Sequence, residues 1–306
     1  MEKVEEIKIK KRRKMRFNSD VPFNAVVWTL MVVIMLLWLI PLLYVFSAAF
    51  SSADAILSGD MLFIPRGWNI EGFKLIFQYD GFGRSYLNTI LYCMLTLAVS
   101  MPLTLCAAYP LSRGDFMAKK FIMVVYTITL FFGGGLVPTY LLIRNLHLYN
   151  SVLALVLPGV SVWNIIIVRS YFNTRIPKEL QEAANIDGCG DFAFFLRIAV
   201  PLSSPILIVI GLYALVGQWN SYFGAMIFLD DRAKYPLQLL LRELLLSSDA
   251  AAHVNSWAGI NPADQLTALM AMKYGTIIIS AVPLILLYAF IQKYFIRGVM
   301  VGSLKG

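Results

Sequence analysis

Six long apolar segments, separated by polar stretches, set the pattern of this chain. None of them contains Asp, Glu, Lys, Arg or His, and they cover residues 25–50, 86–108, 121–143, 152–168, 205–229 and 274–291. A helix needs about 20 apolar residues to cross a bilayer, and these segments approach or exceed that length. The pattern therefore predicts an all-α membrane protein with six transmembrane helices over residues 25–295. A basic arm at residues 1–24 precedes this region, and a tail at residues 296–306 follows it.

Composition supports this prediction, and the positions of the charges orient it. The chain is 59% hydrophobic and only 14% charged, whereas soluble domains average about 25% charged residues. Eight of the 26 Lys and Arg residues lie in the first 16 residues, ahead of the first apolar segment. Such a basic cluster is typical of a topology signal that contacts anionic lipid. With the N-terminus inside, 18 of the 26 basic residues fall on the cytoplasmic side. This asymmetry predicts that both termini are cytoplasmic.

The basic arm does not favour nucleic-acid binding, because no aromatic residue is interleaved with its charges before Phe17. The apolar segment that follows is longer than a signal-peptide core and lacks a small-x-small cleavage site after it, so we expect it to remain as a span. The three cysteines, Cys93, Cys106 and Cys189, have no metal-binding spacing, and no disulfide is expected among them.

The sequence contains no recognisable nucleotide-binding, metal-binding or catalytic motif. The glycines at 133–135 lack the Gly-Lys-Ser/Thr of a phosphate loop and lie in an apolar segment, where they favour close helix packing or a local break. His147 and His253 are far apart and are interpreted as surface residues. No catalytic residue, metal site or cofactor is expected. Spans without ionisable groups also argue against ion coupling, because an ion-coupled transporter usually holds such a group in the membrane.

The polar stretch at residues 172–204 is the most ordered of the loops. Pro177 is predicted as the first residue of a helix that continues through the good helix formers at 178–187 and that Gly188 ends in a left-handed conformation. A second helix is predicted from an N-cap at Asp191 to Val200. One face of the first helix, at positions i, i+3, i+4 and i+7, carries Leu180, Ala183, Ala184 and Asp187. Such a face fits a socket on a partner, and the alternative is an ordinary interfacial amphipathic helix.

The order of residues in this loop resembles a known family. Glu182-Ala183-Ala184 is followed by three residues and Gly188, then by nine residues and Ile198-Ala199-Val200-Pro201. The pattern resembles the cytoplasmic loop of the smaller permease subunit of maltose-type carbohydrate ABC importers, with Val200 where that family usually has Leu. Segments 138–151, 217–229, 235–245 and 295–306 resemble the same family, especially a Gram-positive branch that imports complex oligosaccharides.

The resemblance implies a six-span type I importer permease in the cell membrane of a Gram-positive bacterium. It implies pairing with a second, related permease. It also implies two ATPase subunits that bind ATP and Mg²⁺, and an extracellular solute-binding protein that delivers an oligosaccharide. The permease itself is then not an enzyme. Carried over by motif, Glu182, Ala183, Ala184, Asp187 and Gly188 form the ATPase-coupling helix. The tail at residues 302–306 either reaches between the ATPase subunits or is a plain terminus.

Candidate sugar contacts are aromatic and neutral polar residues, because sugar hydroxyls need partners and sugar C–H faces stack on rings. The fifth apolar segment places Gln218, Trp219, Asn220, Ser221 and Tyr222 in a row. They are predicted to line a substrate pathway near mid-membrane, or else to hold helices together. Further candidates are Trp163 and Asn164, and an outer rim or interface at Asn88, Thr89 and Tyr92.

The long loops at 51–85 and 230–273, predicted to lie outside, either form a docking face or only connect spans. The predicted function is an oligosaccharide permease driven by partner ATPases. The alternatives are an ion-coupled transporter subunit and a membrane scaffold that does not transport.

Overall fold

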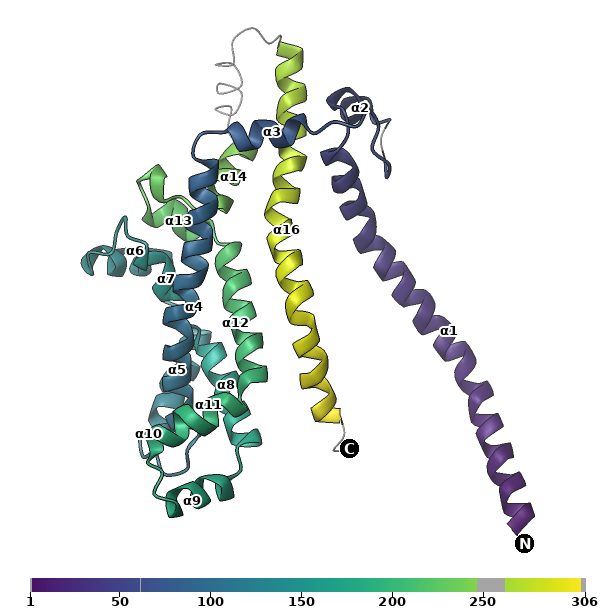
Figure 1. Cartoon of the computed structure of the whole chain (residues 1–306), viewed down its shortest axis with the longest axis vertical. Coiled ribbons are helices and arrows are strands. Elements are labelled where there is room, and N and C mark those ends of the chain that lie inside the picture. The colour runs from purple at the N-terminus through teal and green to yellow at the C-terminus, as the bar shows by residue number, and fades with distance from the viewer. Residues whose placement is uncertain (1, 61, 247–261, 304–306) are drawn as a thin grey trace. The chain divides into compact units, whose positions relative to one another are not determined.

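The protein is a helical chain in which the described residues contain no β-strand (Figure 1). The computed structural model describes residues 2–60, 62–246 and 262–303, with side chains described for 21–245 and 269–292 except positions 53, 57, 61 and 271. It divides into two compact units, Met1–Lys74 with Ile260–Ile278, and Leu75–Gly259 with Ile279–Gly306. The predicted all-α class is confirmed.

The first unit is built on one long helix. Helix α1 runs without a break over Glu2–Ala49, so the predicted arm and the first predicted span form a single helix through Pro22 and Pro41. Most of its apolar side chains from Val21 onward are exposed, as expected for a surface that meets lipid or another subunit. Phe50, just after α1, stacks on Trp68 with ring centroids 5.0 Å apart. The unit also contains α2 (Ala53–Ser58) and the first part of α16 (Pro262–Ser303).

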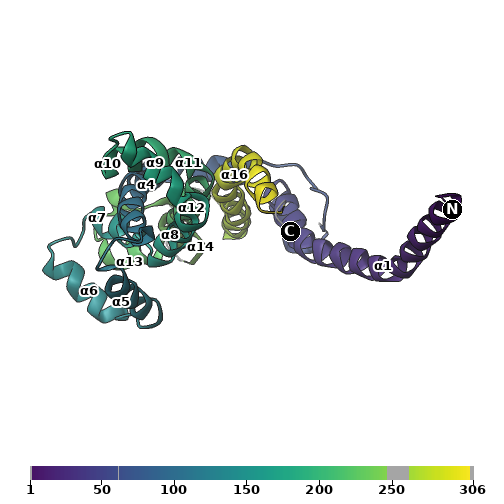
Figure 2. The same ribbon diagram turned by 90° about the horizontal axis from the view of Figure 1, so that it is seen from below.

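The second unit packs around α4 (Phe82–Ser112), which lies beside α8 (Val162–Arg175) and α12 (Ser204–Trp219) (Figures 1 and 2). The buried face of α4 carries a row of small hydroxyl side chains: Ser85, Thr89, Thr96, Ser100 and Thr104. Small residues let neighbouring backbones approach closely. A Cβ on Gly159 would lie only 2.8 Å from Thr96 Cγ2, so that turn packs on α4 because it has no side chain.

The remaining elements of the described residues are short helices and turns. They are α3 (Glu71–Gln78), α5 (Lys119–Phe131), α6 (Leu136–Asn145), α7 (Leu153–Val156), the 3₁₀ turn η1 (Leu157–Gly159), α9 (Lys178–Ile186), α10 (Asp191–Phe194), the π turn η2 (Phe195–Ala199), α11 (Val200–Leu202), α13 (Phe223–Phe228), the 3₁₀ turn η3 (Arg232–Lys234) and α14 (Leu237–Leu246).

Four helical segments of the described chain are long and apolar enough to cross a membrane: Val21–Ala49, Phe82–Ser112, Leu153–Arg175 and Met272–Gln292. Two further pairs are sharply bent, by 119° between α5 and α6 and by 78° between Asp191–Leu202 and Ser204–Trp219. Six spans result only if each bent pair counts as one, so the number six stays a prediction.

Two predicted spans need correction. The segment 121–143 is not one straight helix, because the chain leaves the helix at Phe132 and turns through Gly135, whose φ is 82°. The prediction of one span over 205–229 is wrong at its C-terminal end, because α12 ends at Trp219 and the separate helix α13 follows. The polar residues after Trp219 favour a turn over a continued apolar helix.

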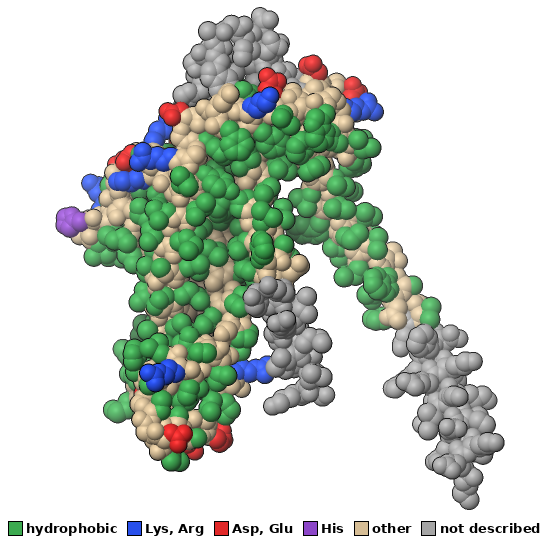
Figure 3. All heavy atoms as spheres, viewed as in Figure 1, with side chains coloured by type: hydrophobic (Ala, Val, Ile, Leu, Met, Phe, Trp, Pro, Cys, Tyr) green, Lys and Arg blue, Asp and Glu red, His purple; other side chains and the backbone are tan. Residues whose placement is uncertain are grey.

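Hydrophobic side chains cover the middle of the second unit along α4 and α12, while charged side chains gather at its two ends (Figure 3). This banding matches a surface that meets a hydrocarbon layer between two aqueous phases. The end that carries α9 is the end that the charge count predicts to be cytoplasmic. The predictions for residues 304–306 and for 247–261 of the outer loop lie outside the described residues.

Candidate functional site

The polar loop at residues 172–204 contains two short helices, α9 and α10, at one end of the second unit (Figure 1). Helix α9 begins after Pro177, which is its N-cap with φ −61° and ψ 146° and not its first helical residue as predicted. Helix α10 has Gly190 as its N-cap, and Asp191 is the first helical residue, so the predicted cap is also shifted by one position. In both cases a helix begins within one residue of the predicted start.

Gly188 ends α9 as predicted, with φ +76°. The amide of Gly188 donates to Asn185 O at 3.1 Å, and the amide of Cys189 donates to Ala184 O at 2.8 Å. These two bonds form a Schellman motif, which requires a left-handed residue after the helix. Only glycine adopts that conformation without a Cβ penalty. The motif turns the chain back, so that Cys189 packs beside Ala184 against the core of the unit.

The two faces of this loop differ sharply. Ala184 is 7% exposed and packs in a cluster with Phe172, Phe194 and Phe195. The predicted common face is therefore wrong at Ala184, which faces the chain's own core. The outward side carries exposed Glu182, Ala183 and Asp187.

Two large apolar side chains that the sequence interpretation passed over project from the same loop. Ile186 is 86% exposed and Phe192 is 72% exposed. Ile186 is followed by Asp187 and Phe192 is preceded by Asp191, so each exposed apolar side chain has a carboxylate next to it in the sequence. The signal was present in the sequence as two bulky residues in a polar loop, but the sequence did not indicate which of Phe192, Phe194 and Phe195 faces outward.

The second predicted helix of the loop is interrupted. Residues Phe195–Ala199 form a π turn between α10 and α11, and the chain then bends by 78° into α12. Single π turns widen a helix by one residue and often occur at functional sites. Here the π turn brings both Phe195 and Ala199 into the buried cluster, which seats the returning half of the loop.

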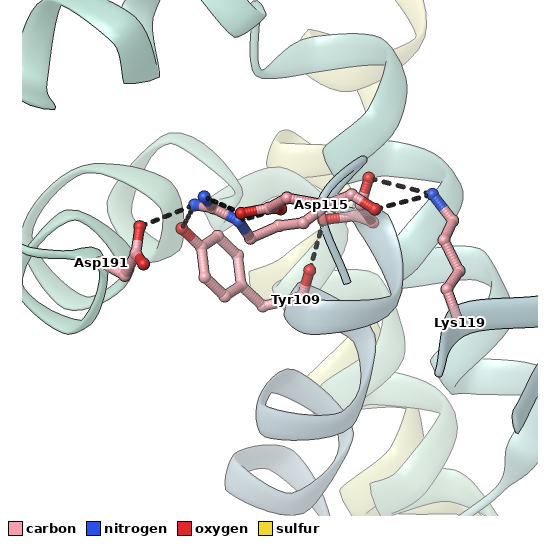
Figure 4. Close-up of polar contacts among 6 residues, drawn as sticks. Tyr109, Asp115, Lys119 and Asp191 are labelled. Atoms are coloured by element: carbon pink, nitrogen blue, oxygen red, sulfur yellow. Dashed lines mark hydrogen bonds and ion pairs between the residues drawn. The ribbon is translucent and has the colours of Figure 1, made fainter. Parts of the chain in front are cut away.

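Arg113, at the end of α4, ties this loop to the rest of the unit (Figure 4). Its Nη1 lies 3.0 Å from Asp191 Oδ1 on α10 and donates to the Tyr109 hydroxyl at 3.1 Å. Its Nε and Nη2 donate to the two carboxylate oxygens of Asp115, at 3.0 and 2.9 Å. The Arg113 side chain is only 13% exposed, whereas Asp191 is 66% exposed. One guanidinium thus joins α4, the following turn and the polar loop.

The surroundings of Arg113 hold it in place. The Tyr109 ring packs between Phe195 and Phe172, with centroid distances of 4.8 and 5.8 Å. Lys119 Nζ donates to Arg113 O at 2.9 Å, and Arg169 Nε donates to Leu111 O at 2.9 Å. These cations satisfy carbonyls that the end of a helix leaves free.

Arg113 and Asp115 hold each other in the ionised form. The hydrogen bonds that Arg113 donates to Asp115 raise the pKa of Arg113 and lower the pKa of the Asp115 carboxyl. A carboxylate with a lowered pKa stabilises the folded state above its ordinary pKa. That contribution is lost only as the pH falls through the lowered value. The pair therefore stays ionised throughout the neutral range.

The predicted pathway residues do not form one lining. Trp219 is 6% exposed, donates from Nε1 to Ser280 O at 3.0 Å, and meets Tyr86 edge to face at 5.8 Å. It therefore joins α12 to α16 and is a packing residue. Asn220 donates to Val216 O at 2.9 Å within its own helix end. Trp219 is the last residue of α12 and Asn220 follows it, so these residues lie at a helix end and not inside a continuous helix, and their depth in the membrane stays a prediction.

The other predicted candidates are scattered. Gln218 is buried, at 8% exposure. Tyr222 is 40% exposed, with Arg242 lying 5.4 Å above its ring. Asn164 is half-buried in α8, and its neighbour Trp163 is exposed. In the described part of the chain, no group of three or more His, Cys, Asp or Glu residues could hold a metal ion.

At the opposite end of α4, the predicted rim residues hold a loop. The Tyr92 hydroxyl donates to Lys234 O at 2.7 Å, and Asn88 Nδ2 donates to Ala233 O and Tyr235 O at 2.9 and 3.1 Å. Thr89 Oγ1 accepts from the amide of Leu237 at 2.7 Å. A cavity of about 240 Å³ lies beside these contacts, lined in part by Tyr79, Asp80, Arg84, Arg232 and Tyr235.

Comparison with known proteins adds close relatives. No protein-family model matches the chain. It is 34% identical over 286 residues to the Bacillus subtilis polygalacturonan/rhamnogalacturonan transport system permease protein YtcP, covering 93% of this chain and 98% of that protein. It is 34% identical over 311 residues to the probable ABC transporter permease protein YurM of the same organism, and this match covers 98% of this chain and 93% of YurM.

A solved structure is similar over nearly the same length. It comes from a bacterial ABC transporter involved in the import of the acidic polysaccharide alginate. The match has a TM-score of 0.80 and 28% identity, and it covers 90% of this chain and 98% of that one. The likeness in sequence and in structure therefore extends over almost the whole chain and is not restricted to the polar loop.

Proposed function

The chain belongs to the family of sugar- and oligosaccharide-transporting ABC permeases, and from that premise we propose how it is driven and what it carries. It is a multi-pass protein of the cell membrane and the permease subunit of an importer. The alternatives of an ion-coupled transporter and of a scaffold without transport no longer apply. The proposal concerns the partners, the driving contact and the class of substrate.

We propose that the permease pairs with a second, related permease. Two ATPase subunits that bind ATP and Mg²⁺ then engage the loop at 172–204 from the cytoplasm. The observation that carries this proposal is the exposed surface of the loop, which carries the apolar Ile186 and Phe192 as well as the carboxylates of Glu182 and Asp187. Apolar anchors desolvated in a partner's pocket supply affinity, and carboxylates accept charged hydrogen bonds from its Arg or Lys. Ala183 and Gly188 allow close approach, and Ala184 seats the helix.

A solute-binding protein is proposed to deliver the substrate at the opposite face, where α4 holds residues 233–237. Alternating access then follows: ATP binding closes the ATPase dimer, the loop moves, and the spans open outward. In this proposal both termini are cytoplasmic and six spans cross the membrane. Asn164, Asn220 and Tyr222 remain proposed pathway contacts, whereas Gln218 and Trp219 are assigned to packing.

We propose that the substrate is an acidic oligosaccharide. One similar protein is the permease of a polygalacturonan/rhamnogalacturonan transport system, and another belongs to a transporter involved in the import of the acidic polysaccharide alginate. The cavity beside α4 is lined by Arg84 and Arg232 together with Asp80, and Arg232 also pairs with Glu243 at 2.8 Å. Arg84 is therefore the guanidinium that we propose meets a substrate carboxylate, whereas a neutral sugar offers it hydrogen bonds without an opposite charge.

A ligand screen of the partner binding protein tests the substrate class. We expect oligogalacturonides or related uronate oligomers to bind at least about tenfold more tightly than neutral arabino-oligosaccharides of equal length, a difference of about 1.4 kcal/mol. Isothermal titration calorimetry measures both affinities, and raised salt should weaken only the uronate. Tighter binding of the neutral oligomers would contradict the acidic assignment and leave the permease assignment intact.

A further inference from the structure

Helix α4 is held by side chains at both of its ends, and each end holds a different loop. At one end, Arg113 binds Asp191 of the polar loop. At the other end, Asn88, Thr89 and Tyr92 bind the backbone of residues 233–237. The two sets of contacts lie about 32 to 38 Å apart along the helix axis at 1.5 Å per residue. A single helix therefore connects the two loops on opposite faces of the unit.

We propose that Arg113 is a positioning residue that couples the polar loop to α4, so that movement of the loop is transmitted to residues 233–237. This inference rests on the proposed function, in which ATPase subunits move the loop. Contiguous ion pairs and rigid helices can carry such coupling over this range. The Arg113–Asp191 pair is the polar contact that crosses directly from α10 to the end of α4.

The contacts of Arg113 favour a role in transmitting movement of the polar loop to α4 over a role in stabilising the fold alone. Arg113 is nearly buried and is fixed by Asp115, Tyr109 and the packing of the Tyr109 ring, so it moves with α4. Asp191 stands on the loop and is mostly exposed. Removing Asp191 therefore buries no unpaired charge, because Arg113 keeps Asp115. The bond to Asp191 contributes little to holding Arg113 in place, and its loss should affect the loop more than the fold.

Two carboxylates on the same guanidinium provide a matched comparison. Asp191 lies 3.0 Å from Arg113 and belongs to the loop, whereas Asp115 lies 2.9 Å from it in the turn that follows α4. Asp191→Asn removes the charge that crosses to the loop. Asp115→Asn removes an equally close charge that does not cross. A general loss of electrostatic stability would affect both variants, whereas loss of coupling would affect only the first.

The test uses the full complex of both permeases with the ATPase subunits. In a variant whose Cys93, Cys106 and Cys189 are replaced, Ala233→Cys reports on the far end of α4. Its labelling rate with a membrane-impermeant maleimide is measured with and without Mg²⁺ and a non-hydrolysable ATP analogue. We expect the analogue to change the rate roughly two- to thirtyfold, the range of coupling that a single contact modulates.

Arg113→Gln and Asp191→Asn should abolish this change, Asp115→Asn should retain it, and Asp191→Glu should restore it by keeping the charge. Co-purification of the ATPase should be the same in all four variants, because the outward face of the loop is untouched. An analogue effect that survives Asp191→Asn, or is lost equally in Asp115→Asn, overturns the coupling role of Arg113. If the parent complex itself shows no ATPase or no response, the proposed function fails and this inference falls with it.

Discussion

Replacing Gly188 by proline should detach the ATPase from this permease while leaving the chain in the membrane. Proline fixes φ near −65°, and Gly188 has φ +76°. The substitution also removes the amide that donates to Asn185 O. An incompatible proline costs more than about 1 kcal/mol, and here the whole cost falls on the turn that orients α9. We expect the ATPase recovered with affinity-purified permease to fall at least about tenfold, equivalent to about 1.4 kcal/mol.

Gly190→Pro is the matched control for this variant. Gly190 lies two residues further along the loop with φ −67° and ψ 157°, values that proline adopts readily. The chain already uses a proline in the same role, because Pro177 caps α9 with φ −61° and ψ 146°. Gly190→Pro should therefore keep the ATPase attached. Equal recovery of the ATPase with both variants would show that the turn at Gly188 does not orient the docking helix.

Replacing Phe194 by alanine should loosen the polar loop from the rest of the protein. Phe194 is 1% exposed and lies in the cluster that also contains Ala184 and Phe172. Truncating a buried phenylalanine costs about 3–5 kcal/mol, because apolar burial is lost and a cavity remains. The expected result is a clearly lower midpoint of thermal denaturation in detergent, with faster proteolysis within the loop.

Phe192→Ala, two residues earlier in the chain, is the matched comparison and should affect ATPase binding but not stability. Phe192 is 72% exposed, so its truncation leaves no cavity and should leave the denaturation midpoint unchanged. Its expected defect is weaker binding of the ATPase, because an exposed aromatic side chain acts as an anchor only when a partner covers it. A stability loss in Phe192→Ala, or a normal midpoint in Phe194→Ala, would contradict the assigned inner and outer faces of α10.

Local signals in the sequence predicted the local structure of the loop. A run of good helix formers over 178–187 and a following Gly188 were sufficient to place α9 and its left-handed end within one residue. These features depend on residues within a few positions of one another, where propensity and capping rules apply. The apolar segments were found for the same reason, because length and hydropathy are local properties.

Tertiary choices were not predicted, because they depend on which residues meet in the folded chain. Arg113 and Asp191 lie 78 positions apart in the sequence, and nothing in either segment indicates that they pair. Ala183 and Ala184 look alike in the sequence, yet Ala184 is buried and Ala183 is exposed. The polar run at 218–222 was placed in mid-span because apolar residues flank it, whereas the helix ends at Trp219.

ATP-driven uptake by the reconstituted complex tests the central claim most directly. The two permeases and the ATPase are placed in proteoliposomes, and the binding protein is supplied outside with the labelled oligosaccharide that it selects in the screen. Uptake should require Mg²⁺ and ATP on the side of the polar loop, should persist when proton and sodium gradients are collapsed, and should be lost in Gly188→Pro. Uptake that continues without ATP and follows an ion gradient would contradict a permease driven through this loop.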